Sequence, residues 1–233
     1  MSYMAQPNQQ LPAMPPSPPM STSAASTSSA ISSVSIRPPT KYLSKIALNA
    51  SRRPLSADWL SRTWSVAHST LDMWQSARNV RITYTQLAPK NNRIRLDDMV
   101  EYESNKTAAK HPVKSVLGID SVASADAEDL GSWNWRGRGL LFWVTSHWEI
   151  LGWGESKLPS GETECWVVTW FAPTMFTKEG VDIYCSRPEG LSEETYTQIM
   201  SELKRAGGKH ISKLVSENMA PVEIRLPWAE SDI

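Results

Sequence analysis

The chain has 233 residues and carries 24 basic and 24 acidic side chains, so its formal net charge is zero. Neutral charge argues against a dedicated nucleic-acid-binding protein, and two cysteines are too few for a disulfide scaffold. No run of apolar residues reaches 18, so the sequence predicts no membrane-spanning helix. Eleven tryptophans accompany only three phenylalanines, so indole rings are expected to build the core or a pocket.

Charge and composition divide the chain near residue 57. Residues 1–57 contain no acidic side chain and nine of the sixteen prolines, and the first 36 residues are uncharged and rich in serine. Such a composition cannot bury enough apolar surface to offset chain entropy, so we expect a disordered N-terminal extension over 1–57. The start lacks the basic and apolar parts of a secretory signal, which predicts a cytoplasmic protein. A transit-like segment ending at Arg52 and Arg53 makes mitochondrial import the alternative.

From residue 58 onward the dominant hydrophobic period is two, as in half-buried β-strands. Val80, Ile82 and Tyr84 alternate with polar residues, while Asp98 falls on the apolar side of the next strand, which indicates a bulge or an internal polar group. Eight strands are predicted, at about 63–68, 80–85, 93–103, 113–120, 133–143, 147–153, 165–171 and 181–187. The pattern alone predicts a sandwich or a barrel without choosing between them.

One helix is predicted after the last strand, at about 192–206. Ser192 can cap it, Glu193 and Glu194 suit the positive end of the helix dipole, and Gly207 follows its last turn. Residues 211–215 are expected to form a short extra strand, and residues 221–233 a C-terminal tail.

Two regions of the sequence resemble the lipocalin family of the calycin superfamily, in particular its bacterial and apolipoprotein-D-like members. Residues 60–69 (LSRTWSVAHS) are similar to the first-strand G-x-W signature, with Arg62 in place of the glycine. Residues 183–187 (IYCSR) and the LSEE sequence at 191–194 are similar to the last strand and helix start of the family, whereas the T-D-Y motif is absent. The resemblance implies an all-β fold with one C-terminal helix, an eight-stranded antiparallel up-and-down β-barrel over 58–220.

The same resemblance implies a structural pair at the closed end of the barrel. In the family the first-strand tryptophan lies there and the arginine of the final strand packs across it; Trp64 and Arg187 match these positions. A guanidinium group over an indole face contributes about 0.5–2 kcal/mol. This pair is expected to close the barrel and not to bind a ligand.

An eight-stranded barrel has room inside for side chains or for one small ligand. The tryptophans between residues 133 and 170 therefore either line a flat-walled pocket or fill the barrel. We expect a lipocalin-like binding or carrier protein for a small hydrophobic molecule, without a cofactor, a metal or nucleic acid, and with protein partners unassigned. The candidate ligand-binding residues are Trp135, Tyr84, Tyr102, Trp148, Phe142 and Trp170.

The alternative is an enzyme of the isomerase or cyclase type that acts on a hydrophobic metabolite in the same barrel. His147 and Glu149 share one strand face and are a candidate acid–base pair. Such pairs are common on exposed strands and no nucleophile has an assignable partner, so no catalytic residue is assigned and binding is favoured. Cys165 and Cys185 are expected to be reduced thiols that pack as small hydrophobic groups.

Overall fold

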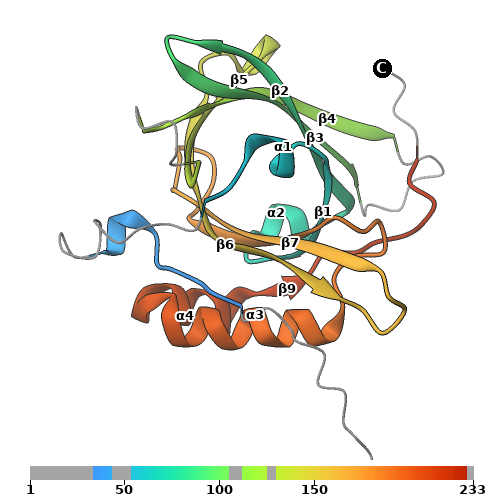
Figure 1. Ribbon diagram of the computed structural model, residues 1–233. Helices are drawn as coiled ribbons and strands as arrows, with labels where there is room; N and C mark the ends of the chain where they lie inside the picture. The colour runs from blue at the N-terminus through green and yellow to red at the C-terminus, as the bar shows by residue number, and fades with distance from the viewer. Residues whose placement is uncertain (1–33, 44–53, 105–111, 125–129, 230–233) are drawn as a thin grey trace, which may run out of the picture. The chain divides into compact units, whose positions relative to one another are not determined.

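The computed structural model describes residues 34–43, 54–104, 112–124 and 130–229. Its eight main strands run antiparallel in up-and-down order around a barrel (Figure 1). Hydrogen bonds from β1 to both β2 and β8 close the barrel, which confirms the predicted fold class. The strands are β1 (Thr63–Ser69), β2 (Ala77–Lys90), β3 (Arg93–Ser104), β4 (Val113–Val122), β5 (Ser132–Gly137), β6 (Thr145–Lys157), β7 (Thr163–Phe171) and β8 (Gly180–Cys185).

Alternation along the strands separates the barrel interior from its outer face. In β2 the apolar side chains of Val80, Ile82 and Tyr84 join the internal core, whereas Arg81 points outward and pairs with Glu101 of β3 at 3.0 Å. β7 and β8 instead have buried residues on both faces. Their outer faces form a second core with the C-terminal helices, so these two strands carry no simple polar alternation.

Two helices follow β8 and pack below β7 in Figure 1. α3 (Glu193–Ala206) is capped by Ser192, whose hydroxyl accepts a hydrogen bond from the Thr195 backbone N–H, as the sequence predicts. The second helix is α4 (Gly208–Asn218). The prediction of a short extra strand over 211–215 is therefore wrong, because these residues are helical. Ile211 and Val215 are both buried because residues four apart lie on one face of a helix.

Residues 34–43, here called the N-terminal strap, lie along the outer side of β6. The backbone N–H of Arg37 donates to the Leu151 carbonyl at 2.9 Å, and the Ile36 side chain is buried in the outer core. A Cβ at Gly152 would come within 2.5 Å of Ile36 Cδ1, so this glycine makes room for the strap. The strap is packed against the barrel, within the range 1–57 for which a disordered extension was expected. Residues 1–33 and 44–53 of that prediction lie outside the described residues.

The predicted C-terminal tail is also packed where it is described. β9 (Ala220–Pro221) pairs with the end of β1, and Val222 is buried. Further along, the Arg81 guanidinium donates to the Ala229 carbonyl at 3.0 Å and lies 5.3 Å from the Trp228 ring. The tail thus covers outward-facing polar groups of β2.

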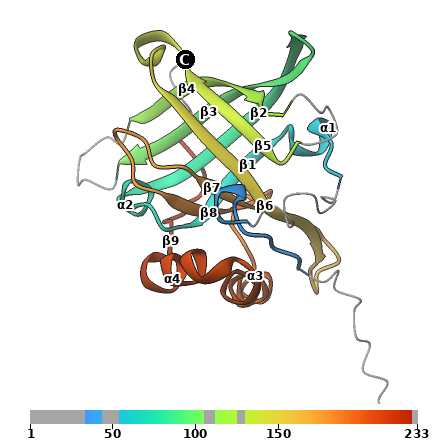
Figure 2. The ribbon, with the colours of Figure 1, turned by 90° about the vertical axis from the view of Figure 1, so that its left-hand side faces the viewer.

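Two single-turn helices mark opposite ends of the barrel (Figure 2). α1 (Ala57–Leu60) leads into β1, and α2 (Asp72–Gln75) connects β1 to β2. No helix in the described part of the chain is long and apolar enough to cross a membrane. The ends differ inside, because side chains fill the barrel near α1 and leave a cavity near α2.

Candidate ligand-binding site inside the barrel

Stacked aromatic rings fill part of the barrel interior. The ring of Trp148 lies between those of Trp133 and Tyr84, at centroid distances of 5.8 and 5.9 Å and interplanar angles of 13°. Toward α1, the Trp64 indole is fully buried and donates to the Leu60 carbonyl at 2.9 Å. The tryptophans thus form much of the internal core as well as the wall of the remaining space.

Arg62, rather than Arg187, covers Trp64. The Arg62 guanidinium lies 5.3 Å from the Trp64 ring and 5.0 Å from the Trp59 ring. The residue that departs from the family signature therefore makes the contact expected of the final-strand arginine.

We expect Arg62→Ala to lower the free energy of unfolding by about 1 kcal/mol, because two indole faces lose their cation. Urea unfolding would measure it, and an unchanged free energy of unfolding would contradict it.

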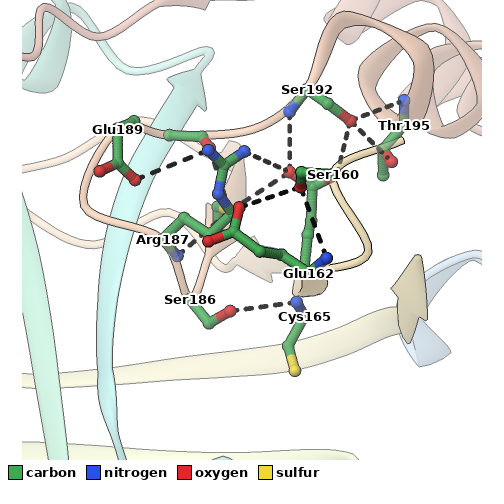
Figure 3. A network of polar contacts seen from close by, with 11 residues as sticks. Ser160, Glu162, Cys165, Ser186, Arg187, Glu189, Ser192 and Thr195 are labelled. Atoms are coloured by element: carbon green, nitrogen blue, oxygen red, sulfur yellow. Dashed lines mark hydrogen bonds and ion pairs between the residues drawn. The ribbon is translucent and has the colours of Figure 1, made fainter. Parts of the chain in front are cut away.

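Arg187 belongs to a polar network that joins β7, β8 and the start of α3 (Figure 3). Its guanidinium lies 3.5 Å from the fully buried Glu164 carboxylate and 3.7 Å from Glu189. Glu164 also accepts hydrogen bonds from the backbone N–H and the hydroxyl of Ser192, at 2.9 and 2.6 Å. The correction to the predicted pair is that Arg187 fixes the helix to the barrel instead of covering Trp64.

A cavity of about 370 Å³ occupies the α2 end of the barrel. Its walls are mainly aromatic and aliphatic, with a few carboxyl and hydroxyl groups. Met73, Trp143 and Phe176 line it and are also solvent-exposed, so they mark its mouth. The inner lining includes Trp74, Ile82, Tyr84, Asp98, Val100, Val116, Trp135, Trp148, Phe171, Asp182 and Tyr184.

Three of the six predicted ligand-binding residues meet at this cavity: Tyr84, Trp135 and Trp148. Tyr102 instead packs edge-on against Trp74, which itself lines the cavity, at a centroid distance of 5.5 Å. Phe142 lies beyond the short helix η3 (Gly139–Leu141) and is 65% exposed. The prediction of a strand over 133–143 is too long, because β5 ends at Gly137.

Trp170 lies on the outer face of β7 and not in the cavity. It is buried in the core beneath the helices, and its indole N–H donates to the Glu179 carboxylate at 2.6 Å. The same carboxylate accepts the Tyr42 hydroxyl of the strap at 2.6 Å. Trp170 therefore helps to hold the strap and the helices against the barrel.

Two aspartates form a carboxyl pair inside the barrel. Asp98 of β3 lies directly across from Tyr84 of β2, and Asp120 of β4 accepts the Trp148 indole N–H at 2.7 Å. Burial, together with the negative charge of Asp120, raises the pKa of Asp98 well above its ordinary value. Burial raises the pKa of Asp120 to about 7 against the opposing hydrogen bonds from Trp148 and Asp98. Two buried carboxyl groups in contact retain a proton between them.

Gly118 allows the indole of Trp135 to approach this pair. A Cβ at residue 118 would lie 2.0 Å from Trp135 Nε1, which no real side chain permits. Gly118 pairs in register with Asp98, and Trp135 pairs with Asp120. A hydrogen bond from Trp135 accordingly limits the rise in the pKa of Asp98.

β8 adds a third buried carboxyl group. Asp182 accepts the Ser69 hydroxyl at 2.5 Å, and burial raises the pKa of this carboxyl to about 7. Tyr184 of the same strand also lines the cavity and is fully buried. The sequence signalled Asp98 through its position on an apolar face, whereas Asp120 and Asp182 were not identified as site residues.

His147 and Glu149 lie on the outer face of β6 and not in the cavity. Their atoms Nε2 and Oε1 are 3.6 Å apart, and Glu149 also binds Arg37 at 2.9 Å and the Thr40 backbone N–H at 3.1 Å. Burial favours the protonated form of Glu149, but hydrogen bonds from His147 and Thr40 and the Arg37 charge lower its pKa to about 2. The pair therefore anchors the strap.

Both cysteines, Cys165 and Cys185, are free and buried, as expected.

The fold and the internal cavity define a lipocalin-like barrel: eight up-and-down antiparallel strands with C-terminal helices on one side. Among solved structures, the chain is similar to apocrustacyanin C1, with 9% sequence identity and a TM-score of 0.43 over 72% of this chain and 78% of that chain. Neither a protein-family profile nor a curated protein matches the sequence.

Proposed function

We propose that the protein binds one small, predominantly apolar molecule inside its barrel. The observation that carries this proposal is the cavity of about 370 Å³ at the α2 end, within the range of about 300–1,000 Å³ usual for small-molecule sites. Its aromatic walls offer flat surfaces for a ligand, and burial of apolar ligand area contributes about 25 cal/mol per Å². The exposed rings of Trp143 and Phe176 at the mouth would contact the ligand as it enters.

Intrinsic tryptophan fluorescence tests the proposal directly, because Trp74, Trp135 and Trp148 line the cavity. A panel of retinoids, sterols, fatty alcohols and small aromatic molecules should include ligands that change the emission in a saturable manner. Isothermal titration calorimetry should then give a stoichiometry of one ligand per chain.

Val116→Trp should abolish this binding, because Val116 points into the cavity and the larger ring would occupy the ligand volume. Leu117→Trp is the matched control: the neighbouring side chain points outward, is 36% exposed and does not line the cavity. We expect at least a tenfold loss of affinity for Val116→Trp and less than a twofold change for Leu117→Trp. Saturable binding that survives Val116→Trp unchanged would place the ligand elsewhere.

A further inference from the structure

The side chains of the cavity lining that can carry a charge at neutral pH are all acidic. Asp98 and Asp182 line it and Asp120 lies against Asp98, whereas no lysine, arginine or histidine is among the described residues of the lining. A ligand bearing a carboxylate or phosphate would meet no cationic partner in this lining and would be repelled by an ionised aspartate. The lining therefore disfavours anionic ligands such as fatty acids.

The cavity also has acceptor atoms without donors. Within the described chain, Oδ1 of Asp98 and Oδ2 of Asp182 receive no hydrogen bond from an N–H or hydroxyl group. The Asp98 side chain is 6% exposed and Asp182 is fully buried. A buried carboxyl oxygen without a donor costs free energy, so a ligand that donates a hydrogen bond to either of these atoms would recover part of it.

We propose that the barrel selects an apolar molecule ending in a protonated amine, with the ammonium group bound at Asp98 and its apolar body against the indole rings. This inference rests on the proposed function, because it assigns the chemical class of the ligand of the same cavity. An ammonium group supplies a donor to the carboxyl oxygen of Asp98 that has none. The ring of Trp135, which also lines the cavity, attracts a cation that lies within about 6 Å of its face, and the attraction strengthens when water is excluded.

Binding of a cation is coupled to the proton balance of the carboxyl pair. Asp98 and Asp120 together hold two protons at low pH. Burial raises the pKa of Asp120 to about 7, so above this pH the pair holds one proton and carries one negative charge. An ammonium ion prefers the form with one negative charge, so binding near neutral pH releases a fraction of a proton to the buffer. Amine affinity should therefore rise about tenfold between pH 6 and pH 8, in proportion to the fraction of the pair that is ionised.

The other titratable groups that face the pair come from two strands. Tyr84 of β2 and Tyr184 of β8 stay neutral, because burial raises the pKa of each well above 10. Asp182 of β8 also has a pKa raised to about 7 by burial and adds to the same pH dependence. Asp97 lies next to Asp98 but on the outer face, where it pairs with Arg138.

Three ligands with one apolar body separate the head-group classes: 4-phenylbutylamine, 4-phenyl-1-butanol and 4-phenylbutyrate. Titration calorimetry of the full chain at pH 8 should give amine affinity at least tenfold higher than alcohol affinity, and the weakest affinity for the carboxylate. Measurements in phosphate and Tris at pH 7 should differ in enthalpy for the amine, because the buffer takes up the released proton and the two buffers have different protonation enthalpies. The two enthalpies should agree for the alcohol.

The double variant Asp98→Asn/Asp120→Asn preserves side-chain shape and removes the charge of the pair. It should lose at least tenfold in amine affinity while its affinity for the alcohol stays within threefold of the unsubstituted chain. Asp97→Asn is the matched control on the opposite face of β3, and it should retain the full preference for the amine.

The class assignment is overturned if the alcohol or the carboxylate binds as tightly as the amine, or if the double variant keeps the preference for the amine. Saturable, Val116-dependent binding of a neutral ligand would then leave the proposed function intact. If none of the three probes and no molecule of the wider apolar panel binds to the protein, both proposals are contradicted.

Discussion

Glu149→Gln is expected to release the N-terminal strap and to lower the free energy of unfolding by about 3 kcal/mol. The substitution removes the buried carboxylate of an ion pair and leaves the Arg37 guanidinium without its partner. The Glu149 side chain is 1% exposed and contacts Arg37 and Thr40 of the strap. Its pKa of about 2 lies below the ordinary 4.5. The stabilisation is therefore complete above pH 4.5 and is lost as the pH falls through about 2. Urea unfolding at pH 7 and pH 3 measures both parts.

Glu202→Gln provides the matched control, since it removes an exposed ion pair with Arg205 on α3. Surface pairs of this kind contribute at most about 1 kcal/mol. Release of the strap should also accelerate cleavage after Lys41 by a lysine-specific protease in the Glu149 variant alone. Equal stability losses in the two variants, or unchanged cleavage after Lys41, would show that Glu149 does not anchor the strap.

Local alternation is sufficient to predict the barrel strands that have one polar face. β2 and β3 follow the rule closely, because their outer faces carry charged pairs such as Arg81 and Glu101. α4 could not be identified in the same way, since Ile211 and Val215 lie in a short mixed segment after two glycines. The position of the strap depends on its contact with Glu149, which is more than a hundred residues away in the sequence. The local composition of residues 34–43 cannot predict a contact over such a separation.

The candidate site is predictable to the same extent. Tyr84 and Trp135 can be identified because inward and outward positions alternate on strands with one polar face. Trp170 lies in the outer core instead of the cavity, and the sequence could not show this because β7 is buried on both faces, so that parity does not distinguish the two. Asp182 escapes prediction for the same reason: it lies between Val181 and Ile183, which pack outward beneath the helices.

The division of the barrel into a filled end and a hollow end explains its unusual tryptophan content. Trp133 and Trp64 fill space, and their indole N–H groups donate to backbone carbonyls. Trp148 belongs to both ends, because its ring completes the stack and also lines the cavity, while its N–H binds Asp120. The same aromatic framework that stabilises the barrel thus positions the buried carboxyl pair.

Asp120→Asn is expected to make the protein more stable at alkaline pH by about 2–4 kcal/mol. Burial raises the pKa of Asp120 to about 7 from 3.8, and each tenfold difference in proton affinity between the folded and unfolded states corresponds to about 1.4 kcal/mol. Because the folded state binds this proton more tightly than the unfolded chain, the associated stability is fully present below pH 3.8 and is lost as the pH rises through 7. The asparagine oxygen can still accept the Trp148 N–H, and its amide group can donate to Asp98.

The diagnostic quantity is therefore the pH dependence of the difference between the two proteins. Urea unfolding at pH 5 and pH 8 should show a stability gain for Asp120→Asn that is larger at pH 8, with Asp97→Asn as the solvent-facing control that shows no such trend. Parallel pH profiles for Asp120→Asn and the unsubstituted chain would mean that Asp120 ionises as easily in the folded protein as in the unfolded one. A gain that grows from pH 5 to pH 8 would establish that Asp120 holds its proton more tightly in the folded protein than in the unfolded chain. This is the proton that amine binding is expected to release.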